Sequence, residues 1–309
     1  MVRSIPLSMN WPPRMKPNAS PKQDLKKTKD SAKTMLKKIQ NKLYSYSESP
    51  YLDSLVLLGH ISGKSKSELI AHPTPELSDA QDQSLSIAIK QLQDGIPLPY
   101  VLGEWDFFSL RFKLTPDVLI PRPETEGLVE LVLDWLQANP GKRSCLEIGT
   151  GSGCIAISLA NSIPDLQLIA TDISSPALQV AKYNARRHEV LDRIQFLERD
   201  LFTGIYMPID LLVANLPYIP TDKLRSLAVY QSEPALALDG GQDGLHYIKE
   251  VLKEAEQHLN PGGAIFLELD EDCGASALAL AKEVWPGITI RLAQDLSGQD
   301  RYLSIQING

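Results

Sequence analysis

The sequence predicts an α/β fold, with a mostly parallel sheet covered by helices on both faces and a small helical domain before it. Three observations support this prediction. From Ser144 onward, apolar runs of strand length alternate with segments whose apolar residues recur every three or four positions. Between residues 31 and 96 only the helical spacing occurs. A glycine-rich turn, 149–153, directly follows the first run of the alternating region.

The 309 residues divide into four predicted parts. Residues 1–30 hold five prolines among polar residues and are predicted to form a disordered basic tail. Residues 31–96 are predicted to form the helical domain, residues 97–122 a linker with a β-hairpin, and residues 123–309 the α/β domain. The apolar residues predicted to share buried helix faces before residue 96 are Met35, Ile39, Leu43, Leu52, Leu55, Val56, Leu58, Leu85, Ala88, Ile89 and Leu92.

The elements after residue 96 follow from local patterns. Residues 105–121 are aromatic and branched, with Thr115-Pro116-Asp117 as the expected hairpin turn. Pro123 is expected to open a helix, since proline suits the first helical turn. The predicted strands are 144–148, 166–171, 193–198, 209–214, 264–269, 288–293 and 302–307. The predicted helices between them are 154–160, 177–188 and 245–259.

Composition and charge exclude several classes of protein. Three cysteines without a CxxC motif argue against a disulfide framework or zinc ribbon, and the histidines show no metal-ligand spacing, so no metal site is expected. No apolar run reaches the roughly 18 residues that a membrane span needs. An intracellular, reducing compartment fits best.

The net charge of −7 is unevenly distributed. Residues 1–43 carry +9 and the remainder −16. An acidic body argues against nucleic acid as the main substrate, because phosphate neutralisation requires Lys and Arg. The basic tail is compatible with an RNA- or membrane-touching arm, an organellar transit peptide or a solvated extension.

The first chemical motif is LEIGTGSGC, 146–154, in which Gly149, Thr150, Gly151, Ser152 and Gly153 join a buried strand to a helix. Glycines there allow a ligand to approach the backbone, and the helix start offers free N–H groups. Asp172 ends the next strand, where a carboxylate can accept hydrogen bonds from both ribose hydroxyls of a nucleoside cofactor. The G-x-G-x-G spacing and Glu147 favour S-adenosylmethionine (SAM) over a dinucleotide.

The second motif is NLPY, 215–218, at the carboxyl end of the strand IDLLVA. Asn215 offers a side-chain carbonyl, and Pro217 biases Leu216 toward an extended backbone whose carbonyl turns outward. Two adjacent acceptors can bind both hydrogens of an NH₂ group, while Tyr218 can stack on a planar group. Methylation of an amide or aryl amine needs this arrangement, because the nitrogen lone pair must leave conjugation.

These motifs resemble the HemK/PrmC family, which methylates the glutamine side-chain nitrogen of peptide chain release factors. The resembling segments are VLIPRPETEGLVE (118–130), LEIGTGSGCIAISLA (146–160), NLPY (215–218), EPALALDGGQDGL (233–245) and DLSGQDRYLSI (295–305). The likeness is close over 97–307 and extends to 44–96 only as a helical domain of suitable size. Leu216 departs from the usual NPPY spelling but retains the main-chain carbonyl that the family uses.

The resemblance implies a class I, Rossmann-like SAM-dependent methyltransferase. It implies methyl transfer to N5 of the glutamine in the GGQ motif of a class 1 release factor, with Asn215, Leu216, Pro217 and Tyr218 at the reaction. It implies that Asp200 and Leu201 border the adenine, that Asn215 also contacts the cofactor, and that the helical domain recognises the substrate. A cytoplasmic protein with no stable nucleic-acid or membrane partner is expected; if the basic tail is a transit peptide, an organelle is the alternative.

Two other functions share these motifs. A nucleic-acid methyltransferase acting on the amino group of adenine or guanine could use the same tetrapeptide, although the acidic body and the IPRPET segment favour a protein substrate. A non-enzymatic SAM-fold binding module in translation is the third hypothesis, and the intact Asn215 and glycine loop argue against it.

Overall fold

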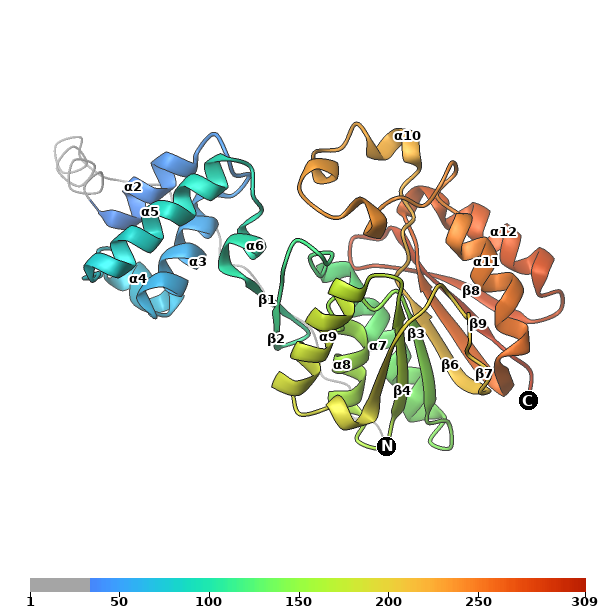
Figure 1. Cartoon of the computed structure of the whole chain (residues 1–309). Helices are drawn as coiled ribbons and strands as arrows, with labels where there is room; N and C mark the ends of the chain where they lie inside the picture. The colour runs from blue at the N-terminus through green and yellow to red at the C-terminus, as the bar shows by residue number, and fades with distance from the viewer. Residues whose placement is uncertain (1–33) are drawn as a thin grey trace, which may run out of the picture. The chain divides into compact units, whose positions relative to one another are not determined.

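The structure, a computed structural model, describes residues 34–309 and forms two compact units, one ending at Gln93 and the other spanning Asp94–Gly309 (Figure 1). The predicted disordered tail, 1–30, lies outside the described residues. The boundary between the two units falls close to the end of the predicted helical domain. The predicted hairpin region belongs to the second unit.

The first unit is helical, as predicted. Its helices are α2 (Met35–Leu43), α3 (Pro50–Ser62), α4 (Lys66–Ala71) and α5 (Asp79–Gln93). The predicted buried face of α3 is wrong in part, because Leu52 is exposed and Leu57 is fully buried. Helix α3 packs against α2, α4 and α5, so these three neighbours, and not a single apolar stripe, decide which of its side chains are buried.

The second unit opens with α6 (Leu98–Leu102) and a hairpin of β1 (Glu104–Phe107) and β2 (Leu110–Lys113). Its turn is Phe108-Ser109, both with positive φ (49° and 62°), and not the expected Thr115-Pro116-Asp117. A two-residue turn with two left-handed residues matches the twist of the paired strands. The Thr-Pro-Asp sequence forms a separate turn after β2, closed by a hydrogen bond from Val118 N–H to the Thr115 carbonyl.

The core of this unit is a seven-stranded sheet in the order β5-β4-β3-β6-β7-β9-β8. The five strands β5 to β7 are parallel, whereas β9 runs antiparallel to both β7 and β8. The mostly parallel sheet is therefore confirmed. The strand bounds are β3 Ser144–Ile148, β4 Gln167–Asp172, β5 Ile194–Glu198, β6 Ile209–Ala214, β7 Leu259–Glu268, β8 Thr289–Gln294 and β9 Asp300–Gln306.

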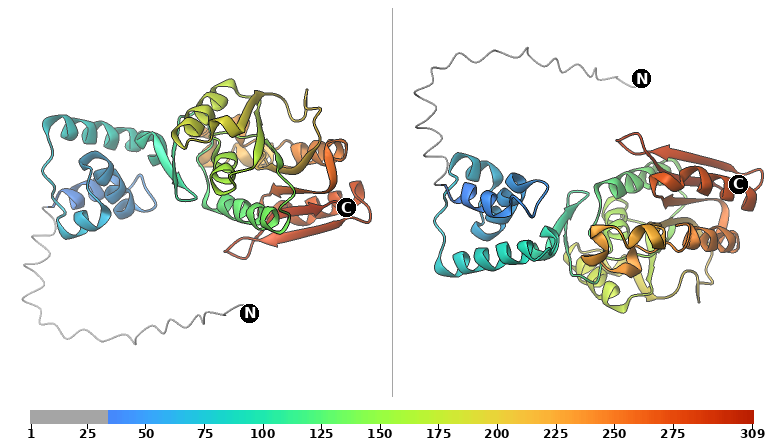
Figure 2. Two further views of the ribbon diagram at one scale, coloured as in Figure 1. Left: turned by 90° about the horizontal axis from the view of Figure 1, so that it is seen from below. Right: turned by 90° about the horizontal axis from the view of Figure 1, so that it is seen from above.

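Helices cover both faces of the sheet (Figures 1 and 2). One face packs against α7 (Pro123–Ala138), α8 (Cys154–Ser162) and α9 (Ser175–Arg187). The other face packs against α11 (His246–Glu254) and α12 (Gly274–Val284). Neighbouring residues of one strand belong to opposite faces, as Cys145 and Leu146 show. Helix α11 ends five residues before the predicted end, and a 3₁₀ turn, Ala255–Gln257, follows it.

The sheet topology places the two motifs together. From β3 the chain builds outward through β4 to β5, then returns to β6 on the other side of β3. The strand order therefore reverses between β3 and β6, and ligands of open α/β sheets bind at the carboxyl ends of strands at such a point. The glycine loop follows β3 and the NLPY segment follows β6.

Candidate active site

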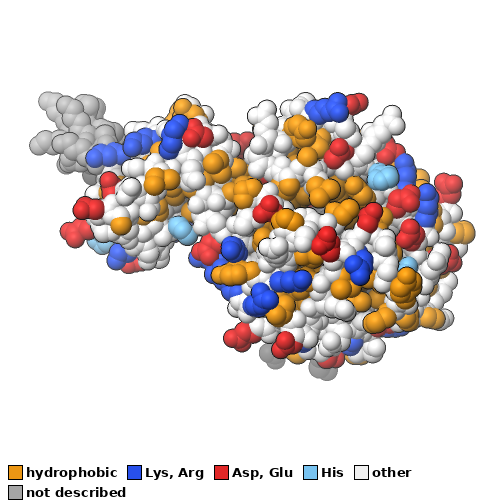
Figure 3. All heavy atoms as spheres, viewed as in Figure 1, with side chains coloured by type: hydrophobic (Ala, Val, Ile, Leu, Met, Phe, Trp, Pro, Cys, Tyr) orange, Lys and Arg blue, Asp and Glu red, His pale blue; other side chains and the backbone are white. Residues whose placement is uncertain are grey.

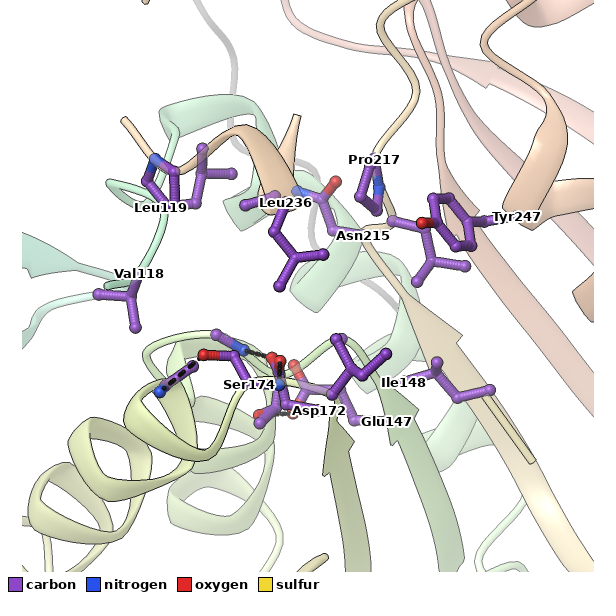
Figure 4. A pocket seen from close by; sticks show the side chains of 18 of the residues that line it. Val118, Leu119, Glu147, Ile148, Asp172, Ser174, Asn215, Pro217, Leu236 and Tyr247 are labelled. Carbon is purple, nitrogen blue, oxygen red and sulfur yellow. Dashed lines mark hydrogen bonds between the residues drawn. The ribbon is translucent and has the colours of Figure 1, made fainter. Parts of the chain in front are cut away.

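A cavity of about 660 Å³ lies at this edge of the sheet. Its lining includes residues from both motifs: Gly149, Thr150, Gly151, Ser152, Asp172, Asp200, Leu201, Asn215, Leu216 and Pro217. The space-filling view shows hydrophobic side chains gathered on this face, beneath the segment that carries α10 (Thr221–Leu224) (Figure 3). In the close-up, Asn215 and Pro217 lie on one side of the cavity, and Asp172 and Glu147 lie on the other (Figure 4).

The glycine loop takes the left-handed backbone that its sequence suggests. Gly149, Gly151 and Gly153 have φ of 74°, 54° and 83°, a region in which other residues are strained. A Cβ at Gly149 would lie 3.1 Å from Leu216 Cδ2, and one at Gly153 would lie 2.8 Å from Ile157 Cδ1. A Cβ at Gly151 would meet nothing within 4 Å, so at Gly151 the backbone borders open space.

Asp172 connects the end of β4 to the glycine loop. Its Oδ2 accepts from Gly151 N–H at 2.8 Å and its Oδ1 from Ser174 N–H at 2.9 Å. Burial raises the pKa of this carboxyl group, while the N–H donors of Ser174 and Gly151 oppose the rise. Each carboxylate oxygen has a second lone pair, so the group can still accept hydrogen bonds from a ligand.

Glu147 is a second carboxyl group of the cavity, and its side chain is almost completely buried. Its Oε2 accepts from the Thr150 hydroxyl at 2.6 Å and from Ala156 N–H at 3.2 Å. Its Oε1 is buried without a hydrogen-bond partner in the described chain. Burial raises the pKa of Glu147 to about 8.

Asp200 and Leu201 both line the cavity, after the end of β5. Leu201 has a φ of 47°, which is unusual for a residue with a Cβ. Strain of this kind is concentrated at ligand sites, where the surrounding fold compensates for it.

Asn215 lies between the cavity and helix α7. Its Nδ2 donates to the hydroxyl of Thr125 at 3.1 Å. The amide nitrogen thus faces Thr125, and no described residue donates to the amide oxygen. Asn215 can therefore act as an acceptor, which is the role predicted from sequence.

The other three residues of NLPY have different surroundings. Leu216 is buried, with its side chain against Gly149 and the core of the sheet, and it also borders the cavity. Pro217 lines the cavity. Tyr218 is not among the lining residues; its hydroxyl donates to Glu268 Oε1 at 3.3 Å, and burial raises its pKa. The structure thus does not bring Tyr218 to the cavity with the other three.

A turn from the EPALALDGGQDGL segment supports the NLPY loop from behind. Ile219 N–H donates to the Leu238 carbonyl, and Gly240 N–H donates to the Ile219 carbonyl. A Cβ at Gly240 would lie 2.6 Å from Tyr218 Cα, and one at Gly244 would lie 2.3 Å from the Tyr218 carbonyl oxygen. Such contacts are too short for any side chain, so both positions require glycine.

Two parts of the wall were not predicted from the sequence. Leu119 and Leu236 come from segments far apart in the chain and both line the cavity (Figure 4). Glu233 joins these segments, because it accepts from Arg122 and from Ile120 N–H. The family segments quoted from the sequence contain all five residues, but their pairing depends on the fold.

Comparisons with known proteins match two successive parts of the chain. Residues 34–103 match the PrmC N-terminal domain, and residues 127–232 match the methyltransferase small domain. A release factor glutamine methyltransferase of Moorella thermoacetica is 41% identical over 256 residues, which cover 82% of this chain and 90% of that protein. The protein of the same name from Coxiella burnetii is 38% identical over 281 residues, covering 88% and 98%.

The chain belongs to the release factor glutamine methyltransferase family. The resemblance found in the sequence is thereby confirmed, as are the enzyme class and the methyl donor: the chain is a SAM-dependent methyltransferase. The chain also has a fold similar to the catalytic domain of hMettl16, solved in complex with MAT2A 3'UTR hairpin 6. Their TM-score is 0.50 at 17% identity, covering 75% of this chain and 82% of that one.

The cavity of this release factor glutamine methyltransferase family member suits SAM. The donor is a sulfonium cation, and Glu147 and Asp172 supply carboxyl groups on one side of the cavity. Glu147 Oε1 has no partner of its own in residues 34–309, and an adjacent cation would favour its ionised form. Gly151 leaves its backbone accessible to a ligand.

None of the helices within residues 34–309 combines the length and the apolar composition of a membrane span. The same residues contain no group of three His, Cys, Asp or Glu side chains that could hold a metal ion.

Proposed function

We propose that this protein transfers a methyl group from SAM to the side-chain amide nitrogen (N5) of the glutamine in the GGQ motif of a class 1 release factor. The curated relatives that cover most of the chain carry the name release factor glutamine methyltransferase. The observation that carries the proposal is the Asn215 amide, whose nitrogen is engaged by Thr125 while the residue lines the cavity of the glycine loop.

The proposed roles follow from this geometry. Asn215 Oδ1 and the Leu216 carbonyl accept the two hydrogens of the glutamine NH₂ group, which orients the nitrogen lone pair toward the donor methyl. Pro217 and Tyr218 are proposed to pack on the flat amide, which for Tyr218 requires its ring to face the bound substrate. Asp172, the loop Gly149–Gly153, Asp200 and Leu201 hold the cofactor. SAM supplies the electrophilic methyl group when bound.

Catalysis in this scheme rests on alignment. Holding the nitrogen and the methyl carbon in line contributes most of the rate enhancement in such a transfer. No general base is assigned, since an amide nitrogen that has gained a methyl group is acidic enough to lose its proton to water.

The proposal also concerns domains, partners and location. Residues 31–96 form the substrate-recognition domain, 97–122 the linker and hairpin, and 123–309 the methyltransferase domain. The partner is a class 1 release factor and not a stably bound nucleic acid or membrane. The reaction takes place where that factor acts, in the cytoplasm or, if the basic tail is a transit peptide, in an organelle.

The experiment compares purified release factor with total RNA and DNA as acceptors, followed by mass spectrometry of the factor. We expect one added methyl group on the glutamine of the Gly-Gly-Gln sequence. Methyl transfer to nucleic acid, or transfer to no glutamine, would refute the proposal.

A variant tests the role of Asn215. Asn215→Ala is expected to lower kcat by about 100-fold or more, because the lost acceptor acts mainly in the transition state. The affinity for SAM, measured by calorimetry, is expected to change far less. Equal losses in both quantities would place Asn215 in cofactor binding instead.

A further inference from the structure

Glu268 is a buried carboxyl group next to the candidate active site. It ends strand β7, and β7 pairs with β6 so that Leu267 lies opposite Ala214, the residue before Asn215. The Glu268 residue is 2% exposed. Its Oε1 accepts from the Tyr218 hydroxyl at 3.3 Å, and its Oε2 has no hydrogen-bond partner within residues 34–309. A buried carboxyl group with one free oxygen is costly and needs an explanation.

Thr125 interacts with both Asn215 and Glu268. Its hydroxyl accepts from Asn215 Nδ2 at 3.1 Å, and the residue is 2% exposed. The same hydroxyl lies close enough to Glu268 to lower the pKa of that carboxyl group. A Thr hydroxyl has one hydrogen to donate, so where it donates decides whether its lone pairs are available to Asn215.

We propose that Glu268 is a positioning residue for methyl transfer: through Thr125 it sets the orientation of the Asn215 amide, and through Tyr218 it holds the NLPY loop. This inference rests on the proposed function, since it explains how Asn215 is kept as an acceptor. Neither motif used to identify the site contains Glu268.

The charge of Glu268 decides the orientation. An ionised carboxylate only accepts hydrogen bonds, so in the proposed arrangement it attracts the Thr125 hydrogen toward its unpartnered oxygen and leaves the Thr125 oxygen to receive Asn215 Nδ2. A protonated Glu268 can donate to Thr125 and compete with Asn215 Nδ2. The Asn215 amide can then rotate and present its NH₂ group, a donor, to the NH₂ group of the substrate.

The surroundings of Glu268 place this ionisation in an accessible pH range. Burial raises its pKa to about 7, against the opposing effects of Thr125, Arg301 and Tyr218. Glu124 of α7 raises the pKa further. The other titratable groups that act with it are Tyr302 on β9 and Cys154 at the start of α8. Arg301 is itself paired with Asp295, at 3.1 Å.

The kinetic test compares wild type with Glu268→Gln. Glutamine keeps the size of the side chain and an acceptor for Tyr218, but its NH₂ group acts as a permanent donor toward Thr125. We expect kcat on the release factor to fall tenfold or more with the affinity for SAM unchanged. We expect kcat of the wild type to rise with pH through about 7 and that rise to be absent from the variant.

Variants at Thr125 provide the matched pair. Thr125→Val removes the hydroxyl at similar volume and is expected to lower kcat as Glu268→Gln does. Thr125→Ser retains the hydroxyl and is expected to keep at least half of the wild-type kcat and its pH profile. A purely structural role for Glu268 would leave the pH profile of kcat unchanged, and that result would overturn the inference.

A measurement without substrate separates this inference from the proposed function. In ¹⁵N-labelled enzyme, the side-chain NH₂ signal of Asn215, assigned by its loss in Asn215→Ala, should titrate with a midpoint near pH 7. The titration should vanish in Glu268→Gln. If wild type fails to methylate release factor while the signal titrates, only the proposed function fails. If the wild-type signal does not titrate, the positioning role of Glu268 is refuted, whatever the substrate.

Discussion

Among single residues, three carboxyl groups in or beside the candidate site have raised pKa values. Burial is the largest contribution for Glu147, Asp172 and Glu268 alike. A cavity that excludes water from carboxyl groups also strengthens their attraction for a cation. The three groups contact different parts of the site. Glu147 and Asp172 accept hydrogen bonds from Thr150 and Gly151 of the glycine loop, and Glu268 accepts one from Tyr218.

Asp172 is the residue whose removal should weaken cofactor binding most directly. Asp172→Ala removes charge-assisted hydrogen bonds to the two ribose hydroxyls and should cost roughly 1.5–3 kcal/mol, or about tenfold or more in SAM affinity. Calorimetric titration with SAM measures this. The variant should remain folded by circular dichroism, and unchanged affinity would remove Asp172 from the site.

Glu147 should make the stability of the ligand-free enzyme depend on pH. Its pKa in the folded state, about 8, lies above the ordinary value of 4.5, so between these values the folded state binds more protons than the unfolded state. Its contribution to stability is full below about pH 4.5 and is lost as pH rises toward 8. Glu147→Gln has no such loss.

The Tm of Glu147→Gln minus that of wild type should therefore increase from pH 5 to pH 8. Above pH 8 the difference should stay constant. A shift on the order of 3 °C corresponds to about 1 kcal/mol for a protein of this size. Thermal melts across this pH range give the measurement. A difference that does not change with pH would mean that the pKa of Glu147 is not raised in the folded protein.

At the scale of elements, the NLPY loop depends on a second segment that supports it. The loop follows β6, and the turn around Gly240 and Gly244 holds the backbone of Tyr218 from the side opposite the strand. A hydrogen bond from the Thr221 hydroxyl to Asp239, at 2.6 Å, also joins the residues after the NLPY loop to the supporting segment. The tripeptide Gly240-Gly241-Gln242 thus lies in a segment that supports the NLPY loop.

Gly240→Ala tests this support. The added methyl group would overlap the Tyr218 backbone at 2.6 Å, so the loop must shift; overpacking of this kind costs typically about 1–3 kcal/mol. We expect release factor methylation to fall well below one tenth, with SAM affinity nearly unchanged, because the glycine loop lies elsewhere in the cavity.

Gly141→Ala is the matched control for that substitution, since a Cβ there meets nothing within 4 Å and the backbone is not left-handed. It should match wild type in activity and in Tm. Full activity of Gly240→Ala would show that the loop does not require this support.

At the scale of the whole molecule, all of the cavity belongs to one of the two units. Its lining residues lie between Pro116 and Glu254, within the second unit. Residues 34–93, the described part of the helical unit, do not line that cavity. A single glutamine side chain supplies little affinity, so the factor must be held by a wider surface.

Deleting residues 1–30 should leave methyl transfer to purified release factor within about twofold of wild type. This segment carries five prolines and little apolar periodicity, so it can add little to a packed core. Steady-state kinetics of the shortened enzyme measure the effect. A large loss of activity with normal SAM binding would make the basic segment part of partner recognition.

The α/β sheet, the helical unit before it and the two site motifs were predictable from the sequence. These features depend on local periodicity and on short motifs such as 149–153 and 215–218, which a chain reveals without its fold. The predicted bounds agree with the structure at the start of the helix at Pro123. They also agree at both ends of the strands 144–148 and 209–214.

Three features could not be predicted from the sequence: the hairpin turn, the burial of Leu57 in place of Leu52, and the hydrogen bonds of Asn215 to Thr125 and of Tyr218 to Glu268. Their common reason is that each depends on contacts between distant segments. Glu268 ends a strand as Asn215 does, but a carboxyl group at the end of an apolar run does not indicate what it will face. Pairing β7 with β6 places Glu268 beside the NLPY strand, where it accepts from Tyr218, and α7 brings the Thr125 hydroxyl to the Asn215 amide.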